Sequence, residues 1–394
     1  MRPCQAPNYR RGLVGLVAFS LITTLSVQAR TPNDTEKSVD YVIFKNGDKL
    51  SGALVRFDDS KVLFKSDVVG EVTFPVDKVQ ELRSHGAFVV IRKEERITRI
   101  SKQPGSMTFN DGRVTVADLK GPPETVSSKD LGQIIDKATY IKEVVTNPGP
   151  FQRWAGAITG GATVVNATSR AETYTIGVNL IRAIPAVAYL NRRTRTTFDL
   201  LETFNKLTEP VIPQTVPPSP ASVARTHIFH TAFEHNKYFT PKLYALGSVA
   251  YDHNSTQGLD LQQAYGAGIG ATLIEDEVQQ LDLKGDVHYM RQNFVQFPPP
   301  EESTPNQNLI GSTFSETYRR ALPAKIALTQ SINYTQSWNN THVYSFVGAI
   351  GLAMPFYHRL SISVNTLNTY LNDPAAGFKN NSFQFITGVT YTLR

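Results

Sequence analysis

Apolar and polar side chains alternate along the stretch LDLKGDVHYM, which runs from Leu281 to Met290. The apolar side chains of one parity are Leu281, Leu283, Val287 and Tyr289. The polar side chains of the other parity are Asp282, Lys284, Asp286 and His288. Because successive side chains of a β-strand point to opposite faces, this pattern predicts a strand with one apolar and one charged face.

Two classes of β-protein use such a strand. In a soluble sandwich, the charged face meets bulk water. In a membrane barrel, the apolar face meets lipid and the charged face lines the lumen. If the chain is a barrel, we predict that Asp282, Lys284, Asp286 and His288 form a polar column in its lumen.

The C-terminal part of the chain predicts about twelve strands of this kind. Their ranges are 154–165, 172–183, 196–206, 225–236, 242–252, 261–273, 278–292, 311–321, 325–336, 341–353, 358–370 and 382–393. Most are near the ~9–11 residues that a tilted strand needs to cross a bilayer, whereas strands of soluble proteins are usually about 5–6 residues long. Long alternating strands in an even number predict an antiparallel up-and-down barrel of outer-membrane type.

The predicted connections fall into two groups. The segments 207–224 and 293–310 are long and proline-rich, and both follow an odd-numbered strand. Short turns such as 238–241 and 275–277 follow even-numbered strands. Long loops at one end and short turns at the other are typical of outer-membrane barrels.

The region 41–136 predicts a small β-barrel-like domain of the SH3 or Sm type, made of short strands and tight turns such as Asn46-Gly47-Asp48. Strand patterns at 97–116 are either a second related unit or a continuation of the first, and 130–137 is compatible with one helical turn. Residues 137–153 contain Asn147-Pro148-Gly149-Pro150 and are predicted to be a linker before the barrel domain at 154–394.

The N-terminus predicts export. Arg2, Arg10 and Arg11 precede an uncharged, mostly apolar run, which ends near a small-residue cleavage site at Ala29. We therefore expect a signal peptide at 1–29 and a flexible lead at 30–40, because the apolar run is shorter than the ~20 residues of a spanning helix. We predict the outer membrane as the location of the mature chain.

Composition narrows the chemistry. Cys4 is the single cysteine, so the mature chain would have neither disulfides nor thiolate metal sites. The net charge of +6 includes three arginines of the signal segment, and the remaining basic residues are scattered. A nucleic-acid partner would require a concentrated basic face, so we expect none.

Three motifs could suggest chemistry. Gly266, Gly268 and Gly270 match a dinucleotide-binding loop only superficially, because the strand pattern continues on both sides and no helix opens there. His227 and His230 would face opposite sides of one strand, and His235 would lie ~26 Å from His227 at ~3.3 Å per residue. The three histidines therefore cannot chelate one metal ion.

The polar column is the third motif, with Glu234 or Glu316 as further candidates for the same lumen. Catalysis would require a nucleophile beside a base and an orienting group, and the sequence contains no nucleophile-elbow motif. We expect a luminal charge network, and we predict no catalytic residues, metal ligands or cofactor.

Several segments resemble a known family. They are Trp154 with its glycine-rich strand, KYFTPKLYALGSVAYDHN at 237–254, LDLQQAYGAGIGATLIEDE at 259–277, TYRRAL at 317–322 and the last aromatic-alternating strand. Together, over about 154–394, they resemble the domain of unknown function 481 family, whose members are often labelled salt-induced outer membrane proteins. The resemblance implies an outer-membrane barrel and no known activity. Members commonly end on an aromatic residue that the barrel assembly machinery reads, whereas this chain ends on Arg394.

The sequence thus predicts an outer-membrane barrel with a structural or narrow-channel role and a periplasmic β-module. Expected partners are outer-membrane lipid, the barrel assembly machinery during insertion, and a periplasmic protein or peptidoglycan at the module. Two alternatives stay open at this point. They are a barrel-embedded lipid-modifying enzyme, which would bring a serine and a histidine together in the lumen, and a soluble periplasmic β-sandwich binding protein.

Overall fold

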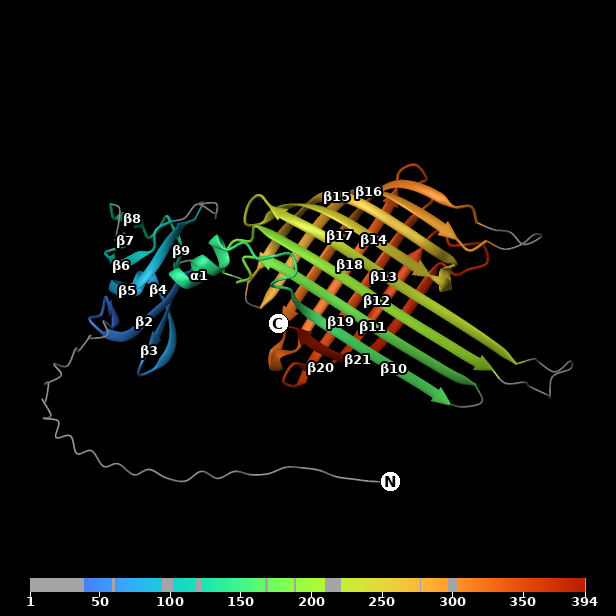
Figure 1. Cartoon of the computed structure of the whole chain (residues 1–394), viewed down its shortest axis with the longest axis horizontal. Coiled ribbons are helices and arrows are strands. Elements are labelled where there is room, and N and C mark those ends of the chain that lie inside the picture. Colours follow the sequence, from blue (N-terminus) through green and yellow to red (C-terminus); the bar gives the residue numbers. More distant parts are fainter. Residues whose placement is uncertain are drawn as a thin grey trace, which may run out of the picture. The chain divides into compact units, whose positions relative to one another are not determined.

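The computed structural model describes residues 39–58, 61–93, 102–117, 122–166, 169–187, 189–209, 221–276, 278–296 and 304–393 (Figure 1). The predicted signal peptide, most of the predicted lead and the predicted strand at 97–100 lie outside these residues. The described chain is almost entirely β-strand. It contains a small N-terminal β-domain and a large closed barrel, so the predicted fold class is confirmed.

The N-terminal domain is a nine-stranded sheet in the order β4-β3-β2-β1-β5-β6-β7-β8, with β9 pairing both β2 and β5. Its strands are β1 Asp40–Phe44, β2 Lys49–Asp58, β3 Lys61–Ser66, β4 Gly70–Pro75, β5 Val79–Arg92, β6 Gly105–Asn110, β7 Arg113–Ala117, β8 Glu124–Ser127 and β9 Leu131–Asp136. The 3-10 turn η1 spans Val76–Lys78. Because β9 joins β2 to β5, the strands β1, β2, β9 and β5 close a small ring.

This domain folds around alternating apolar residues. On β3, for example, Val62 and Phe64 are buried while Lys61 and Lys65 are exposed. The strands β6, β7 and β8 extend the same sheet from the edge of β5. One local expectation was wrong: most of 130–137 forms β9, and the helix α1 begins only at Lys137 (Lys137–Thr139). Ile134 and Ile135 supply two consecutive β-branched buried side chains that favour the strand.

The expected linker also contains regular structure. Asp136 caps α1 by accepting a hydrogen bond from the Thr139 amide, and the π-helix η2 (Tyr140–Val145) follows directly. Tyr140 and Val144 are buried against Val89 on β5. Among the described residues, no helix is of the length and hydrophobicity needed to cross a membrane.

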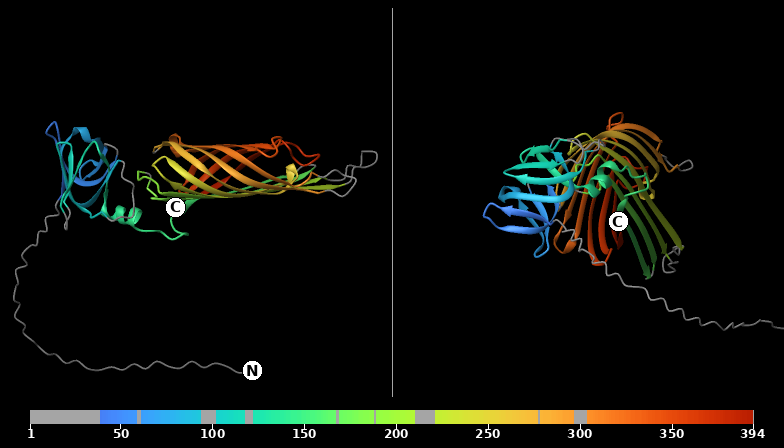
Figure 2. Two further views of the ribbon diagram at one scale, coloured as in Figure 1. Left: turned by 90° about the horizontal axis from the view of Figure 1, so that it is seen from above. Right: turned by 60° about the vertical axis from the view of Figure 1, so that its left-hand side comes forward.

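The barrel closes in the order β10 to β21, with every neighbouring pair antiparallel. Its strands are β10 Ala155–Asn166, β11 Arg170–Ile184, β12 Thr194–Glu209, β13 Ser222–Tyr238, β14 Leu243–Asn254, β15 Leu259–Glu275, β16 Gln279–Phe294, β17 Gln307–Ala321, β18 Ala327–Ser337, β19 Tyr344–Tyr357, β20 Leu360–Leu371 and β21 Asn381–Leu393. Short 3-10 turns, η3 Ser255–Gln257 and η4 Pro323–Lys325, lie in two connections. Pairing of Gly160 with Val389 and of Gly156 with Leu393 completes the ring. Figures 1 and 2 show these strands tilted along one continuous wall.

The two ends of the barrel differ. Both ends of its chain and the connections 185–193, 239–242, 276–278, 322–326 and 358–359 lie at one end, which we call the terminal end. At the other end, which we call the loop end, lie the strand termini Asn166, Glu209, Asn254, Phe294, Ser337 and Leu371. The strands that flank the two long predicted connections therefore end at the loop end, and they extend further than predicted.

The outer wall is apolar. Side chains of one parity point outward and are highly exposed, among them Ile269 at 72%, Phe314 at 66%, Phe385 at 63% and Phe383 at 62%. Side chains of the other parity are enclosed in the lumen and are mostly polar. On β16, exposed Leu283 and Val287 alternate with buried Asp282 and His288.

Candidate functional site: the barrel lumen

The four residues of the polar column lie on the inner face of β16. Asp282 and His288 are each 6% exposed. The Asp286 carboxylate lies 2.8 Å from Nδ1 of His288, and Lys284 forms an ion pair with Glu234 of β13. The column is thus a set of linked side chains facing the lumen. Its role in function stays a prediction.

Ion pairs cross the lumen near the terminal end. Arg195 of β12 donates from Nη1 to Asp282 of β16 over 3.0 Å, although three strands separate them around the wall. Thr272 donates to the second oxygen of Asp282 over 2.6 Å. Arg192, in the connection before β12, lies 2.6 Å from Glu275 at the end of β15. These side chains form a cross-lumen bridge, because the Arg195–Asp282 and Arg192–Glu275 pairs join elements that are not adjacent in the barrel wall.

Aromatic packing fixes this cross-lumen bridge. The Tyr244 side chain is 1% exposed, and its hydroxyl lies 3.3 Å from Nη2 of Arg195. Its ring packs against that of Tyr238, with centroids 5.0 Å apart and the ring planes tilted by 45°. The ring occupies space above Gly270, where an added Cβ would lie 2.3 Å from it. The glycine stretch of β15 therefore accommodates neighbouring side chains within a continuous strand, and no helix starts there.

The opposite wall carries small uncharged side chains. The inner positions of β18 and β20 include Ser331, Asn333, Thr335, Ser363 and Asn365. Thr313 and Thr335 lie within hydrogen-bonding distance at 3.0 Å, as do Thr159 and Thr390 at 2.8 Å. The lumen therefore has a charged wall on β12–β17 and a hydroxyl- and amide-bearing wall on the strands that close the ring.

A second set of contacts spans the loop end, and we call it the clasp. Gln257, in the β14–β15 connection, is 1% exposed and donates to the carbonyl oxygens of Thr369 and Asn380 at 3.3 and 2.9 Å. Thr256 donates to Ser382 over 3.1 Å. The two connections lie six strands apart in a ring of twelve strands, so the clasp crosses the full width of the mouth.

The clasp also has an apolar layer. Leu259, Phe294, Leu371 and Ala375 form a buried cluster against which Phe378 packs. Gly258 has φ of +66°, and a Cβ at this position would lie 2.5 Å from that of Ala375. The turn therefore requires glycine at position 258 for two reasons. Its backbone has a positive φ, and the chain approaches Ala375 too closely for a side chain.

The histidines are separated, as strand geometry requires. His230 faces the lumen, and its Nδ1 atom lies 2.6 Å from the carboxylate of Asp252. His227 lies on the outer wall 2.5 Å from Glu202, and His235 lies on the same wall with Nδ1 2.9 Å from Thr196. Among the described residues, no group of three or more potential ligands could hold a metal ion.

One glutamate lies elsewhere than the sequence suggested. Glu234 faces the lumen, but Glu316 has the same parity as exposed Phe314 and lies on the outer wall between Leu283 and Ile332. Its carboxylate accepts a hydrogen bond from Gln330 over 3.3 Å. Comparing faces across strands needs their register, which the sequence does not provide.

No serine of the described lumen hydrogen-bonds to His288. Its nearest hydroxyl contact is Thr313, 3.5 Å from Nδ1, and its Nε2 atom has no hydrogen-bond partner among the described residues. Asp286 and Thr313 thus both approach the same nitrogen of His288.

The connection 185–193 joins the barrel to the N-terminal domain. Leu190 is buried with Val89, Ile91 and Tyr140. The Arg56 guanidinium lies 4.3 Å from the Tyr189 ring centroid, and burial raises the pKa of the Tyr189 hydroxyl above its usual value.

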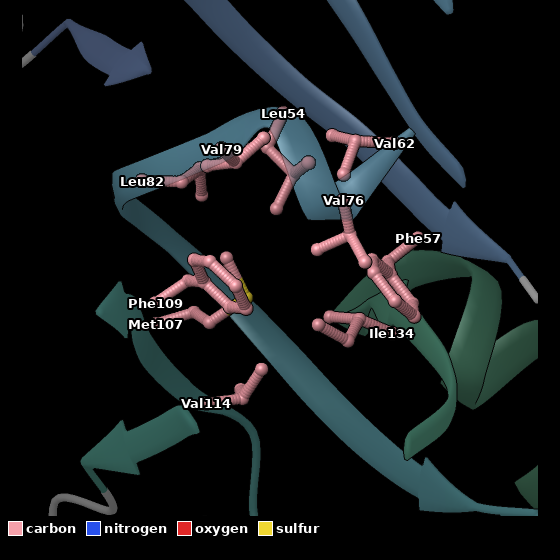
Figure 3. Close-up of a pocket in the computed structure, with 10 residues that line it drawn as sticks. All are labelled: Leu54, Phe57, Val62, Val76, Val79, Leu82, Met107, Phe109, Val114 and Ile134. Carbon is pink, nitrogen blue, oxygen red and sulfur yellow. The ribbon is translucent and has the colours of Figure 1, made fainter. Parts of the chain in front are cut away.

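The N-terminal domain contains a small apolar void, shown in Figure 3. Phe57 of β2, Met107 and Phe109 of β6, and Ile134 of β9 point into it. Its volume of about 10 Å³ is no larger than the space for one water. It is a packing gap in the core and offers no room for a ligand.

The comparisons identify the C-terminal part. The profile of the family described as "Protein of unknown function, DUF481" matches residues 219–393, from β13 to the end of β21. This part of the chain is similar to that family. The predicted resemblance is thereby confirmed, although the match does not reach β10, β11 and β12. No curated protein matches the chain.

Solved barrels show weak likenesses. The translocator domain of autotransporter NalP from Neisseria meningitidis is 13% identical, with 60% of this chain and 87% of that chain covered and a TM-score of 0.31. The COG4313 outer membrane channel from Pseudomonas putida F1 is 9% identical, with 63% and 100% covered and a TM-score of 0.32. The transport unit of autotransporter AIDA-I from Escherichia coli is 10% identical, with 64% and 96% covered and a TM-score of 0.30. At these values the likenesses carry no argument about function.

Proposed function

We propose that this chain is an outer-membrane barrel that conducts small polar solutes through a narrow, gated lumen. In the proposed orientation the loop end faces outward and the terminal end, with the N-terminal domain, faces the periplasm. Short turns on the periplasmic side and longer loops outside are the usual arrangement of such barrels.

The apolar outer wall carries this proposal. Exposed rings and aliphatic side chains surround a lumen of charged and hydroxyl side chains. Apolar surface costs about 25 cal/mol per Å² in water, so a wall of this extent is stable only against lipid or another apolar surface.

Aromatic residues mark one edge of the membrane. Six outward-facing tyrosines form an aromatic row near the loop end: Tyr251, Tyr265, Tyr289, Tyr334, Tyr344 and Tyr370. The hydroxyls of Tyr251 and Tyr265 are 3.1 Å apart, and the ring centroids of Tyr344 and Tyr370 are 6.1 Å apart. Such girdles lie at the membrane–water interface in transmembrane barrels.

The lumen supports a conducting role only if its obstructions move. The cross-lumen bridge near the terminal end and the clasp at the loop end both cross the pore. The polar contacts of the clasp are neutral hydrogen bonds, each worth about 1 kcal/mol net, and they break more readily than the buried ion pairs. Opening the clasp also separates its apolar layer.

A disulfide across the clasp tests this function. We would replace Thr256→Cys and Ser382→Cys in the mature chain, where their hydroxyls are now 3.1 Å apart. Cys4 lies in the predicted signal segment, so no other thiol interferes. Planar-bilayer conductance and liposome swelling with small sugars would be measured before and after reduction.

The expected result is low conductance when oxidised and recovery on reduction, with Thr256→Cys alone as the matched control. Equal conductance in both states would show that the clasp is not the gate. A heat-modifiable barrel without conductance in any variant would leave a structural role in place of the channel.

A further inference from the structure

Three basic side chains gather on the outer wall at the loop end of β11, β12 and β13. They are Arg170, Lys206 and Arg225, and we call them the basic cluster. Arg170 and Arg225 are exposed and Lys206 is half-buried. All three have the same outward direction as Tyr174 and Phe204, because they lie at even intervals along the same strands.

Two of these cations are directly opposed. Lys206 and Arg225 are register partners across β12 and β13. Like charges opposite one another on a sheet destabilise it. Among the described residues, neither side chain has a hydrogen bond or ion pair.

The nearby carboxylates are already engaged. Glu172 lies opposite Lys206 but is paired with Arg170 at 2.5 Å. Glu202, two same-face positions closer to the terminal end than Lys206, has its carboxylate 2.5 Å from Nε2 of His227. Lys206 and Arg225 are therefore two cations without an ion-pair partner among the described residues, beside the Arg170–Glu172 ion pair.

The position of the cluster selects the anion. Lys206 is two residues beyond Phe204, and Glu172 two residues beyond Tyr174, in the direction of the loop end. At ~3.3 Å per residue and a strand tilt of about 40°, the cations lie roughly 5 Å beyond the last aromatic side chains of the apolar wall. Headgroup phosphates occupy this depth when aromatic rings mark the interface.

We propose that Lys206 and Arg225 bind the phosphorylated headgroup of a lipid in the outer leaflet, with Arg170 beside them. This inference rests on the proposed membrane insertion. A phosphate accepts charge-assisted hydrogen bonds from both an ammonium and a guanidinium, so one headgroup compensates both opposed charges. Its acyl chains extend along the apolar wall below the cluster.

A binding experiment tests the site directly. Labelled lipid A, which carries phosphate, would be titrated into the barrel refolded in neutral detergent micelles. The variants would be Lys206→Gln, Arg225→Gln and their double. Lys237→Gln is the matched control, because Lys237 lies on the same outer face of β13 at the terminal end.

The expected loss is about fivefold in affinity for each cation removed, since each is worth about 1 kcal/mol near a charged surface. Lys237→Gln should bind like the unmodified chain. Dephosphorylated lipid A should bind the unmodified barrel as weakly as intact lipid A binds the double variant.

Two results would overturn the proposal. One is equal affinity of the double variant and the unmodified barrel. The other is competition by inorganic phosphate as effective as that by lipid A, which would make this a site for a free anion.

A gel mobility shift on boiling would verify that each variant is folded. Loss of this shift in the unmodified chain would contradict membrane insertion itself. An inserted barrel with unchanged binding would contradict only the lipid site. Each single variant removes one of two opposed like charges and is therefore expected to keep the barrel folded.

Discussion

At the scale of single residues, Glu234 and Glu316 show that a glutamate contributes differently to stability on the luminal and on the outer face of the barrel. Glu234 faces the lumen, forms an ion pair with Lys284 and accepts a hydrogen bond from Asn236. Glu316 faces the apolar surroundings with Gln330 as its partner. We predict that Glu234→Leu costs about 2 kcal/mol, because it leaves the Lys284 ammonium without its carboxylate.

The matched change Glu316→Leu should be neutral or stabilise the barrel by up to about 1 kcal/mol, because leucine suits a lipid-facing position. Urea unfolding in micelles, followed by tryptophan fluorescence, would measure both changes. Equal losses for the two variants would contradict the assignment of their faces.

The Arg195–Asp282 pair is the second residue-scale case. Both side chains are less than a tenth exposed. Arg195→Met should cost about 3–5 kcal/mol, because it leaves a buried carboxylate with only neutral partners. Replacing both residues, as Arg195→Met with Asp282→Leu, should cost less than the single change.

Arg320→Met is the control for this pair, since Arg320 is exposed and the change should stay within about 0.5 kcal/mol. Thermal unfolding of the four proteins in one detergent would provide the comparison. A double variant weaker than Arg195→Met alone would disprove the stabilising role of the pair.

At the scale of elements, the glycines of neighbouring strands differ in what surrounds them. Gly270→Ala would bring a Cβ into the ring of Tyr244 and displace the side chain that positions Arg195. We predict a loss of about 1–3 kcal/mol. Gly247→Ala on β14 has nothing within 4 Å of the added carbon and should be tolerated. Similar unfolding midpoints for both variants would contradict the tight packing of the cross-lumen bridge.

Strand positions could be predicted because the alternation is strong. The pattern around Leu283 and Val287 predicts a strand regardless of its partners, and all twelve predicted barrel strands are present. Their ends were less predictable. β12 continues to Glu209, past the predicted end at 206, because polar residues such as Thr208 fit a strand end and a loop equally well.

The contacts that fill the lumen could not be predicted in this way. Arg195 and Asp282 are 87 positions apart, and their meeting depends on barrel closure and on the register of four intervening strand pairings. The same holds for Gln257 and Asn380 in the clasp. All members of the polar column lie on one strand, β16, so the alternation of that strand alone predicts that they share a face.

At the scale of the whole molecule, the two tryptophans should report the membrane boundaries. Trp154 precedes β10 at the terminal end, and Trp338 follows β18 at the loop end. Trp338 is 52% exposed and points its indole nitrogen at Ser312, 3.3 Å away. In liposomes, lipids brominated near the headgroup should quench both residues more strongly than lipids brominated near the chain ends. Single-tryptophan variants would separate the two signals, and stronger quenching from the bilayer centre would contradict this placement.

The central claim is that the apolar outer wall requires lipid. Heat-modifiability tests it most directly: the mature chain is refolded with and without lipid micelles, and boiled and unboiled samples are compared on a denaturing gel with circular dichroism alongside. We predict a β-spectrum that appears only with micelles and a mobility shift on boiling. A monodisperse β-protein in plain buffer with no shift would contradict the membrane barrel.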